Sequence, residues 1–158
     1  TRIQVEHPIT EMITGVDLIK EQINIAYGKK LDICQEDINI NGHSIECRIN
    51  AEDANNNFRP SPGEIQGYFT PGGYGVRIDS HIYDGYTIPP TYDSMIGKLI
   101  VWGKNRHEAI NRMKSVLDEI VITGINTNIN FHKEILNNES YLNNKIDTSF
   151  LDRQILNR

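Results

Sequence analysis

The chain has 158 residues, 38% of them hydrophobic, and a formal net charge of -5. This is enough for one domain with a hydrophobic core and part of a second. Acidic and basic residues are interspersed without a Lys/Arg cluster, which argues against nucleic acid as a partner. No apolar run is long enough to cross a bilayer and the amino end shows no signal peptide, so we expect no membrane contact and a cytoplasmic location.

The chain begins at Thr1 rather than at a methionine, and residues 2–5 are typical of the middle of a strand. We therefore expect a piece of a longer protein. Its cysteines, Cys34 and Cys47, lack the CxxC spacing of zinc or redox sites and are expected to be ordinary reduced thiols. The five histidines show neither HxH nor HExxH spacing, so no metal site is expected.

The first half of the chain predicts one helix and one half-buried strand. Residues 14–28 are expected to be helical, with Thr14 as cap, Gly28 as end and an apolar stripe of Val16, Ile19, Ile23 and Ala26. Residues 43–50 alternate between apolar and polar side chains, as in a strand with one buried face. Residues 55–63 are expected to be a loop because two prolines and a glycine exclude regular pairing.

The second half predicts further strands and then helices. Strands are expected at 64–69 and 75–79, flanking a tight connection at residues 71–73, and at 95–102. A helix is expected over 105–121, capped by Asn105 with Glu108 at its third position and stopped by Gly124. Weaker helices follow at 129–136 and 150–155, separated by an asparagine-rich loop. Antiparallel strands followed by helices favour an α+β fold.

Three polar residues near the amino end form the first candidate site. In an extended strand, Arg2, Gln4 and Glu6 would share one face. Arginine supplies a forked donor for a planar anion, glutamine a donor and an acceptor, and glutamate a base. Such a face suits a small planar anion with a removable proton. A solvated strand face with a surface Arg–Glu pair remains the alternative.

A second polar face lies on the strand around Cys47 and carries Glu46, Arg48 and Asn50. An arginine facing a cleft could stabilise an enolate or another developing oxyanion, although spacing alone equally allows a solvated face. The run Pro71-Gly72-Gly73-Tyr74-Gly75 lacks the ending of a phosphate-binding loop and is interpreted as a turn. Asp93, after two prolines, is either a cap or an arginine's partner, and its spacing favours the cap.

Several of these motifs together resemble one family. The runs Thr1-Arg2-Ile3-Gln4-Val5-Glu6-His7-Pro8-Ile9-Thr10-Glu11 and Glu46-Cys47-Arg48-Ile49-Asn50-Ala51-Glu52-Asp53 resemble biotin carboxylase. The runs Pro60-Ser61-Pro62-Gly63, Pro71-Gly72-Gly73 and Tyr92-Asp93-Ser94-Met95-Ile96-Gly97-Lys98-Leu99 follow in the order and spacing of that family. The resemblance covers residues 1 to about 135.

The resemblance implies an ATP-grasp ligase in which ATP and bicarbonate give carboxyphosphate, and CO2 passes to biotin on a carrier protein. Arg2, Gln4 and the backbone of Val5 match positions that hold bicarbonate, and Glu6 matches its general base. Arg48 matches the arginine that stabilises the biotin enolate, and Asp93 resembles a residue near it. Bicarbonate is also the kind of anion that the strand-face interpretation requires.

The resemblance further implies that residues 1–42 end an ATP-grasp domain and that residues 43–158 form the family's carboxyl-terminal domain. ATP with Mg²⁺ or Mn²⁺ would bind the full-length enzyme, and biotin would arrive on its carrier. The family's nucleotide-contacting lysines and metal-binding glutamates precede Thr1, so this chain alone is expected to bind no MgATP and to be inactive.

Partners implied are a biotin carboxyl carrier protein, carboxyltransferase subunits and a second copy of the enzyme. The leading expectation is the biotin carboxylase subunit of acetyl-CoA carboxylase, in fatty-acid synthesis. The alternatives are the equivalent module of pyruvate, propionyl-CoA or urea carboxylase. A hypothesis of another class is a non-catalytic binding or dimerisation module, with Tyr74 and Arg77 as contact groups.

Overall fold

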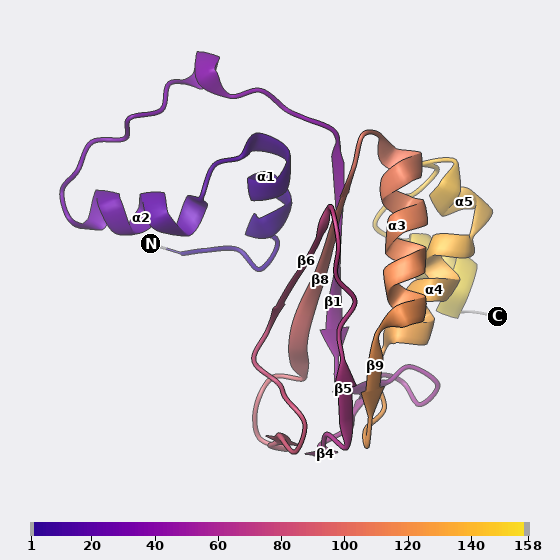
Figure 1. Ribbon diagram of the computed structural model, residues 1–158. Coiled ribbons are helices and arrows are strands. Elements are labelled where there is room, and N and C mark those ends of the chain that lie inside the picture. The colour runs from indigo at the N-terminus through magenta and orange to yellow at the C-terminus, as the bar shows by residue number, and fades with distance from the viewer. Residues whose placement is uncertain (1, 157–158) are drawn as a thin grey trace.

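The computed structural model describes residues 2–156 and confirms the α+β class (Figure 1). The helices are α1 (His7–Thr14), α2 (Leu18–Ala26), α3 (Arg106–Glu119), α4 (Ile129–Asn137) and α5 (Glu139–Leu142), with a 3-10 turn at Gln35–Asp37 and a π-helical turn at Asp152–Leu156. The strands are β1 (His43–Asn50), β2 (Glu52–Asp53), β3 (Arg59–Pro60), β4 (Gly63–Glu64), β5 (Gly67–Phe69), β6 (Val76–Ser80), β7 (Thr87–Ile88), β8 (Met95–Gly103) and β9 (Val121–Thr123).

A three-stranded antiparallel sheet in the order β1-β8-β6 organises the molecule. Its register pairs Cys47 with Leu99 and Arg48 with Lys98. The alternation of side chains predicted for residues 43–50 is confirmed, because Ile45, Cys47 and Ile49 are buried on the face that packs against α3. The opposite face of β1 carries the polar residues Ser44, Glu46, Arg48 and Asn50.

The hydrophobic core lies between the apolar face of this sheet and α3. Leu99 and Val101 of β8 are completely buried there, as are Ala109, Met113 and Leu117 of α3. Removing one leucine-sized side chain from water contributes about 1.5–3 kcal/mol, so this layer supplies much of the stability. Helix α3 begins as predicted, since the Asn105 side chain accepts the backbone N–H of Glu108 at 3.0 Å.

Helix α1 lies on the other, polar face of the sheet, while α2 and the segment leading to β1 extend to the side (Figure 1). None of the α2 residues is buried. The predicted apolar stripe is largely in solvent, with Ile19 42% and Ile23 52% exposed. The amino-terminal segment therefore contributes little to the core.

Two predictions for the amino-terminal segment need correction. The helix predicted over 14–28 is present but shorter, as α2, and its cap is Asp17, which accepts the N–H of Lys20, rather than Thr14. Helix α1, which was not predicted, precedes it and ends where Gly15 adopts a left-handed conformation (φ +76°). The expected strand over Arg2–Glu6 is absent. Instead the Gln4 carbonyl accepts the N–H of His7 at 3.2 Å, which closes a turn and starts α1.

Three smaller predictions also need correction. Residues 55–63 were expected to be an unpaired loop, but they include strand β3, which pairs with β2. Proline lacks a backbone N–H but can still occur in a short edge strand, as Pro60 does here. Residues 64–69 form two short strands rather than one, and the strands that flank Pro71-Gly72-Gly73 belong to different sheets: β5 pairs with β9 and β6 with β8. Finally, α3 ends at Glu119 and strand β9 precedes Gly124.

Candidate functional site

The two charged residues singled out from separate motifs meet in the structure. Arg48 projects from the polar face of β1, and Glu6 stands at the start of α1. The Arg48 Nη2 atom lies 3.0 Å from Glu6 Oε2, and both side chains remain about half exposed, at 52% and 51%. A base and a forked donor are thus held together where a small solute can reach both.

The backbone of Arg48 is fixed from the carboxyl-terminal side of the chain. Its carbonyl accepts Nδ2 of Asn128 at 3.0 Å and Nε2 of His132 at 2.9 Å. A carbonyl only accepts, so Nε2 of His132 carries a proton, and burial lowers the pKa of this imidazole. Asn128 also accepts the N–H of Asn50 through Oδ1 at 2.9 Å. Arg48 therefore projects from a strand that is secured on both sides.

The backbone of Glu6 is fixed by three consecutive carbonyls. That of Gln4 accepts from His7, through the backbone N–H and through ring Nδ1 at 2.7 Å. That of Val5 accepts Nζ of Lys98 at 3.1 Å, and that of Glu6 accepts the N–H of Ile9 at 3.1 Å. The hydrogen bonds to the Gln4 and Glu6 carbonyls are local, whereas that from Lys98 to Val5 joins residues 93 positions apart.

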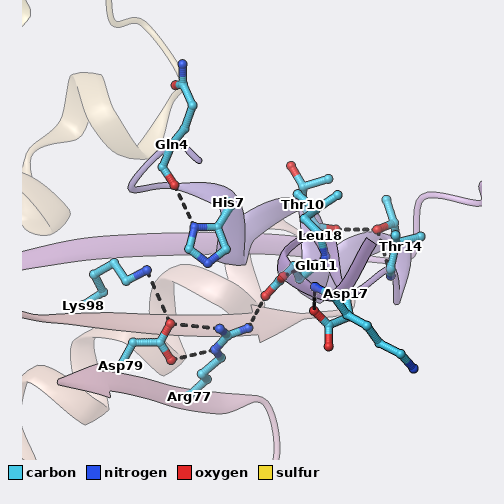
Figure 2. A network of polar contacts seen from close by, with 12 residues as sticks. Gln4, His7, Thr10, Glu11, Thr14, Asp17, Leu18, Arg77, Asp79 and Lys98 are labelled. Carbon is cyan, nitrogen blue, oxygen red and sulfur yellow. Dashed lines mark hydrogen bonds and ion pairs between the residues drawn. The ribbon is translucent and has the colours of Figure 1, made fainter. Parts of the chain in front are cut away.

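Lys98 belongs to a network of charges between α1 and the sheet (Figure 2). Its Nζ lies 3.3 Å from Oδ2 of Asp79, and Arg77 holds Asp79 with two bonds of 2.8 Å. Arg77 also donates to Oε2 of Glu11 on α1 at 2.6 Å. Burial alone would raise the pKa of Asp79, but the bonds and charges of Arg77 and Lys98 outweigh burial and lower it.

A further carboxyl group, that of Glu46, lies on the same polar face beside Arg48. Both of its oxygens are buried without a hydrogen-bond partner, and so is Nε2 of His7. Burial raises the pKa of Glu46 against the opposing charges of Lys98, Arg48 and His7. The polar face around Arg48 is therefore partly buried and carries several ionisable groups, so it is not a solvated strand face.

The remaining predicted site residues make no bond to this pair among residues 2–156. Arg2 is exposed, and its carbonyl accepts from Gln22 at 2.9 Å. The Gln4 side chain points away from His7 (Figure 2). Asp93 accepts the N–H of Met95 at 2.7 Å, which is the turn cap that its spacing favoured.

Sequence reasoning missed the roles of Lys98, Asn128 and His132. Lys98 is the only charged residue in the largely apolar strand β8, and this signal could have identified it, since a charge in such a strand needs partners. Asn128 and His132 follow no motif.

Within residues 2–156, no group of three His, Cys, Asp or Glu side chains is placed to hold a metal ion. No helix in the same range is both long and apolar enough to cross a membrane. Cys34 and Cys47 are both free thiols, Cys34 exposed and Cys47 buried, and burial raises the pKa of Cys47 to about 12.

Two protein-family models match parts of the chain. A model described as "Biotin carboxylase C-terminal domain" matches residues 46–153, and one described as "Carbamoyl-phosphate synthase L chain, ATP binding domain" matches residues 1–34. The chain belongs to the biotin carboxylase family.

Particular relatives agree with this class. The chain is 60% identical to a biotin carboxylase of Nostoc sp. and 61% identical to a pyruvate carboxylase subunit of Methanothermobacter thermautotrophicus. Each match covers 96% of this chain and 34% or 31% of the relative. The chain thus spans about a third of the length of these curated relatives.

Solved structures show the same fold. A Campylobacter jejuni biotin carboxylase complex superposes with a TM-score of 0.92 at 50% identity, covering 98% of this chain and 34% of that one. The biotin carboxylase domain dimer of Hydrogenobacter thermophilus 2-oxoglutarate carboxylase, solved with MgADP, ADP and bicarbonate, gives a TM-score of 0.94 at 50% identity, covering 96% and 34%.

Proposed function

We propose that this chain is the carboxyl-terminal third of a biotin carboxylase that uses ATP and bicarbonate to carboxylate biotin on a carrier protein. In this proposal residues 1–42 end the ATP-grasp domain and residues 43–158 form the carboxyl-terminal domain. The observation that carries it is the 3.0 Å pair of Glu6 and Arg48, which joins these two parts at one exposed site. Relatives named biotin carboxylase over nearly the whole chain support it.

Each charged residue has a separate role in the proposed reaction. Glu6 accepts the proton of bicarbonate, which turns a weak nucleophile into a stronger one. Arg2, Gln4 and the backbone of Val5 hold the oxygens of this anion. Arg48 stabilises the negative charge that develops on the biotin ureido oxygen during carboxyl transfer, with Asp93 nearby. Arg48 contacts the base Glu6 and, in this proposal, also biotin. Deprotonation of bicarbonate and carboxylation of biotin would therefore take place next to each other.

The complete enzyme, in the same proposal, takes ATP with Mg²⁺ or Mn²⁺, biotin on its carrier protein, and carboxyltransferase subunits as partners. We propose acetyl-CoA as the final acceptor, in fatty-acid synthesis in the cytoplasm. Relatives named for pyruvate and for 2-oxoglutarate carboxylation match as well, so the modules of pyruvate, propionyl-CoA or urea carboxylase are the alternatives. Assays of the complete complex with each acceptor distinguish them.

The test of the proposed function is Glu6→Gln in the full-length carboxylase, which keeps the shape of the side chain and removes the base. Bicarbonate-dependent ATP cleavage should be abolished. Glu119→Gln is the matched control, because Glu119 is exposed at the end of α3 on the other side of the sheet. Near-normal carboxylation by the Glu6 variant would refute the assignment. The 158-residue chain alone should show no turnover in the same assay.

Self-association is a second candidate role, favoured by one surface. Tyr74 is 79% exposed, and its ring contacts Trp102 edge-on at 5.9 Å. Arg77 is a poorer contact group, because Nε, Nη1 and Nη2 are all bonded within the chain. Sedimentation of the isolated chain tests the proposal, and a monomer at high concentration would rule out a self-sufficient dimer interface here.

A further inference from the structure

The two members of the charged pair are not equally well secured. Arg48 projects from β1, which pairs along its length with β8, and its carbonyl is held by Asn128 and His132. Glu6 precedes a short helix in a segment without regular structure. Among the described residues, Lys98 is the only side chain of the sheet that bonds the backbone of residues 2–6. The geometry of the pair therefore depends most on this one bond.

The atom that Lys98 holds determines how Glu6 projects. The Val5 carbonyl belongs to the peptide that joins Val5 to Glu6, and this peptide is planar. When Lys98 Nζ fixes the carbonyl at 3.1 Å, it also fixes the N–H of Glu6 and the direction in which its Cα carries the side chain. A catalytic group displaced by about 1 Å loses much of its effect. The lysine thus acts on the base without reaching the reacting atoms.

Lys98 is itself held in place, as such a role requires. Its side chain is only 12% exposed, and its register partner on β1 is Arg48. Asp79 balances its charge at 3.3 Å and is in turn fixed by both ends of the Arg77 guanidinium. Arg77 then reaches Glu11, whose other oxygen accepts the N–H of Leu18 at 3.0 Å. The network joins the start of α1, the sheet and the start of α2.

We propose that Lys98 is a positioning residue for Glu6, which sets the base opposite Arg48 by holding the Val5 carbonyl. This rests on the proposed function and goes beyond it by assigning a role to a residue that touches no substrate. The four charges of Lys98, Asp79, Arg77 and Glu11 cancel, so the network positions the segment without adding net charge to the site.

The test is Lys98→Met in the full-length carboxylase, with steady-state kinetics for bicarbonate and for ATP. Removing a charged donor from a carbonyl loosens the segment, and we expect the KM for bicarbonate to rise about tenfold. The KM for ATP should stay unchanged. Lys98→Arg keeps a charged donor within reach of Val5 and Asp79 and should restore the bicarbonate KM to within about threefold.

Lys133→Met is the matched control, because Lys133 forms a 2.8 Å ion pair with Asp118 on the far side of the sheet. It should leave both KM values unchanged. An unchanged bicarbonate KM in Lys98→Met, or equal rises for bicarbonate and ATP, would overturn the positioning role. If Glu6→Gln is inactive and Lys98→Met normal, only this inference fails; if Glu6→Gln is active, the proposed function fails first.

Discussion

The two parts of the molecule are held together by different forces. Residues 43–156 enclose an apolar layer between the sheet and α3, in which Leu99, Met113 and Leu117 have no exposed surface. In the amino-terminal segment, Pro8 is the only buried residue of α1, and α2 has none. The segment is attached to the polar face of the sheet through ion pairs and single hydrogen bonds.

This difference indicates that stability comes mainly from the apolar core, whereas the charged contacts orient the groups of the candidate site. The hydrophobic effect that stabilises the core is non-directional, and the core side chains are closely packed. The sheet is therefore a rigid support for the groups attached to it. Charged contacts are directional and contribute less to stability, but they fix the orientation of particular groups. The candidate site lies where the two meet, with Arg48 on the sheet and Glu6 on the attached segment.

The largest effect is expected in the core. Leu99→Ala removes a fully buried side chain and should lower the free energy of unfolding by about 2–5 kcal/mol. Ile23→Ala, on the 52% exposed surface of α2, should change it by under about 0.5 kcal/mol. Urea unfolding of the chain measures both. Equal losses would show that α2 is packed as tightly as the core, against the division drawn above.

The junction of the two parts should be nearly as sensitive. Gly42 has φ +72°, and a Cβ atom there would lie 2.4 Å from the Gly103 carbonyl and 2.5 Å from Nε1 of Trp102. Gly42→Ala should therefore cost about 2–4 kcal/mol, through backbone strain and overpacking together.

Gly28→Ala separates these two causes, because Gly28 has a similar φ of +80° but no atom within 4 Å of the new Cβ. It should cost only about 1 kcal/mol, measured by the same unfolding experiment. Similar losses in the two variants would mean that the close contact with Trp102 is not tight.

At the site, Arg48→Lys should impair carboxyl transfer about 100-fold and ATP cleavage much less, because the planar fork matters where charge develops on biotin. Separate assays of the two steps in the full-length enzyme measure this. Arg153→Lys is the control, since Arg153 is also in an exposed ion pair, with 56% of its side chain exposed. Equal losses in both steps would contradict the proposed role of Arg48.

The same division explains which parts of the fold were predictable from sequence. Strand β1 and helix α3 were predicted almost to their ends, because the core selects a repeating apolar face and Asn105 caps locally. Helix α2 was also expected, but the start of the amino-terminal segment was predicted wrongly, as a strand without α1, because the alternation of polar residues there indicates no buried face. Its shape comes from the turn closed by His7 and the left-handed Gly15.

The sequence singles out candidate residues for the site but does not predict their contact. Glu6 and Arg48 were identified from separate motifs, but their contact joins residues 42 positions apart. The supporting bonds from Lys98 and Asn128 join residues 93 and 80 positions apart. Periodicity carries no information over such separations, so the supporting residues appear only in three dimensions.

A smaller effect than that at Arg48 is expected in the polar layer itself. Burial raises the pKa of Glu46 above its ordinary value of 4.5. The charges of Lys98, Arg48 and His7 oppose this shift, and the charge of Glu6 adds a smaller increase. Folding therefore favours the protonated carboxyl group. Its contribution to stability is complete below about pH 4.5 and is lost as the pH rises through the raised value.

Glu46→Gln keeps the shape without the charge and should be more stable than the wild type at about pH 7, by under about 1 kcal/mol after solvent screening. The gain should vanish at about pH 4, where Glu46 is protonated in both folded and unfolded states. Urea midpoints at the two pH values measure this, with exposed Glu119→Gln as control. If the variant is instead less stable at about pH 7, the attraction of Lys98 and Arg48 exceeds the cost of burial, and the polar face stabilises the fold as well as orienting the site.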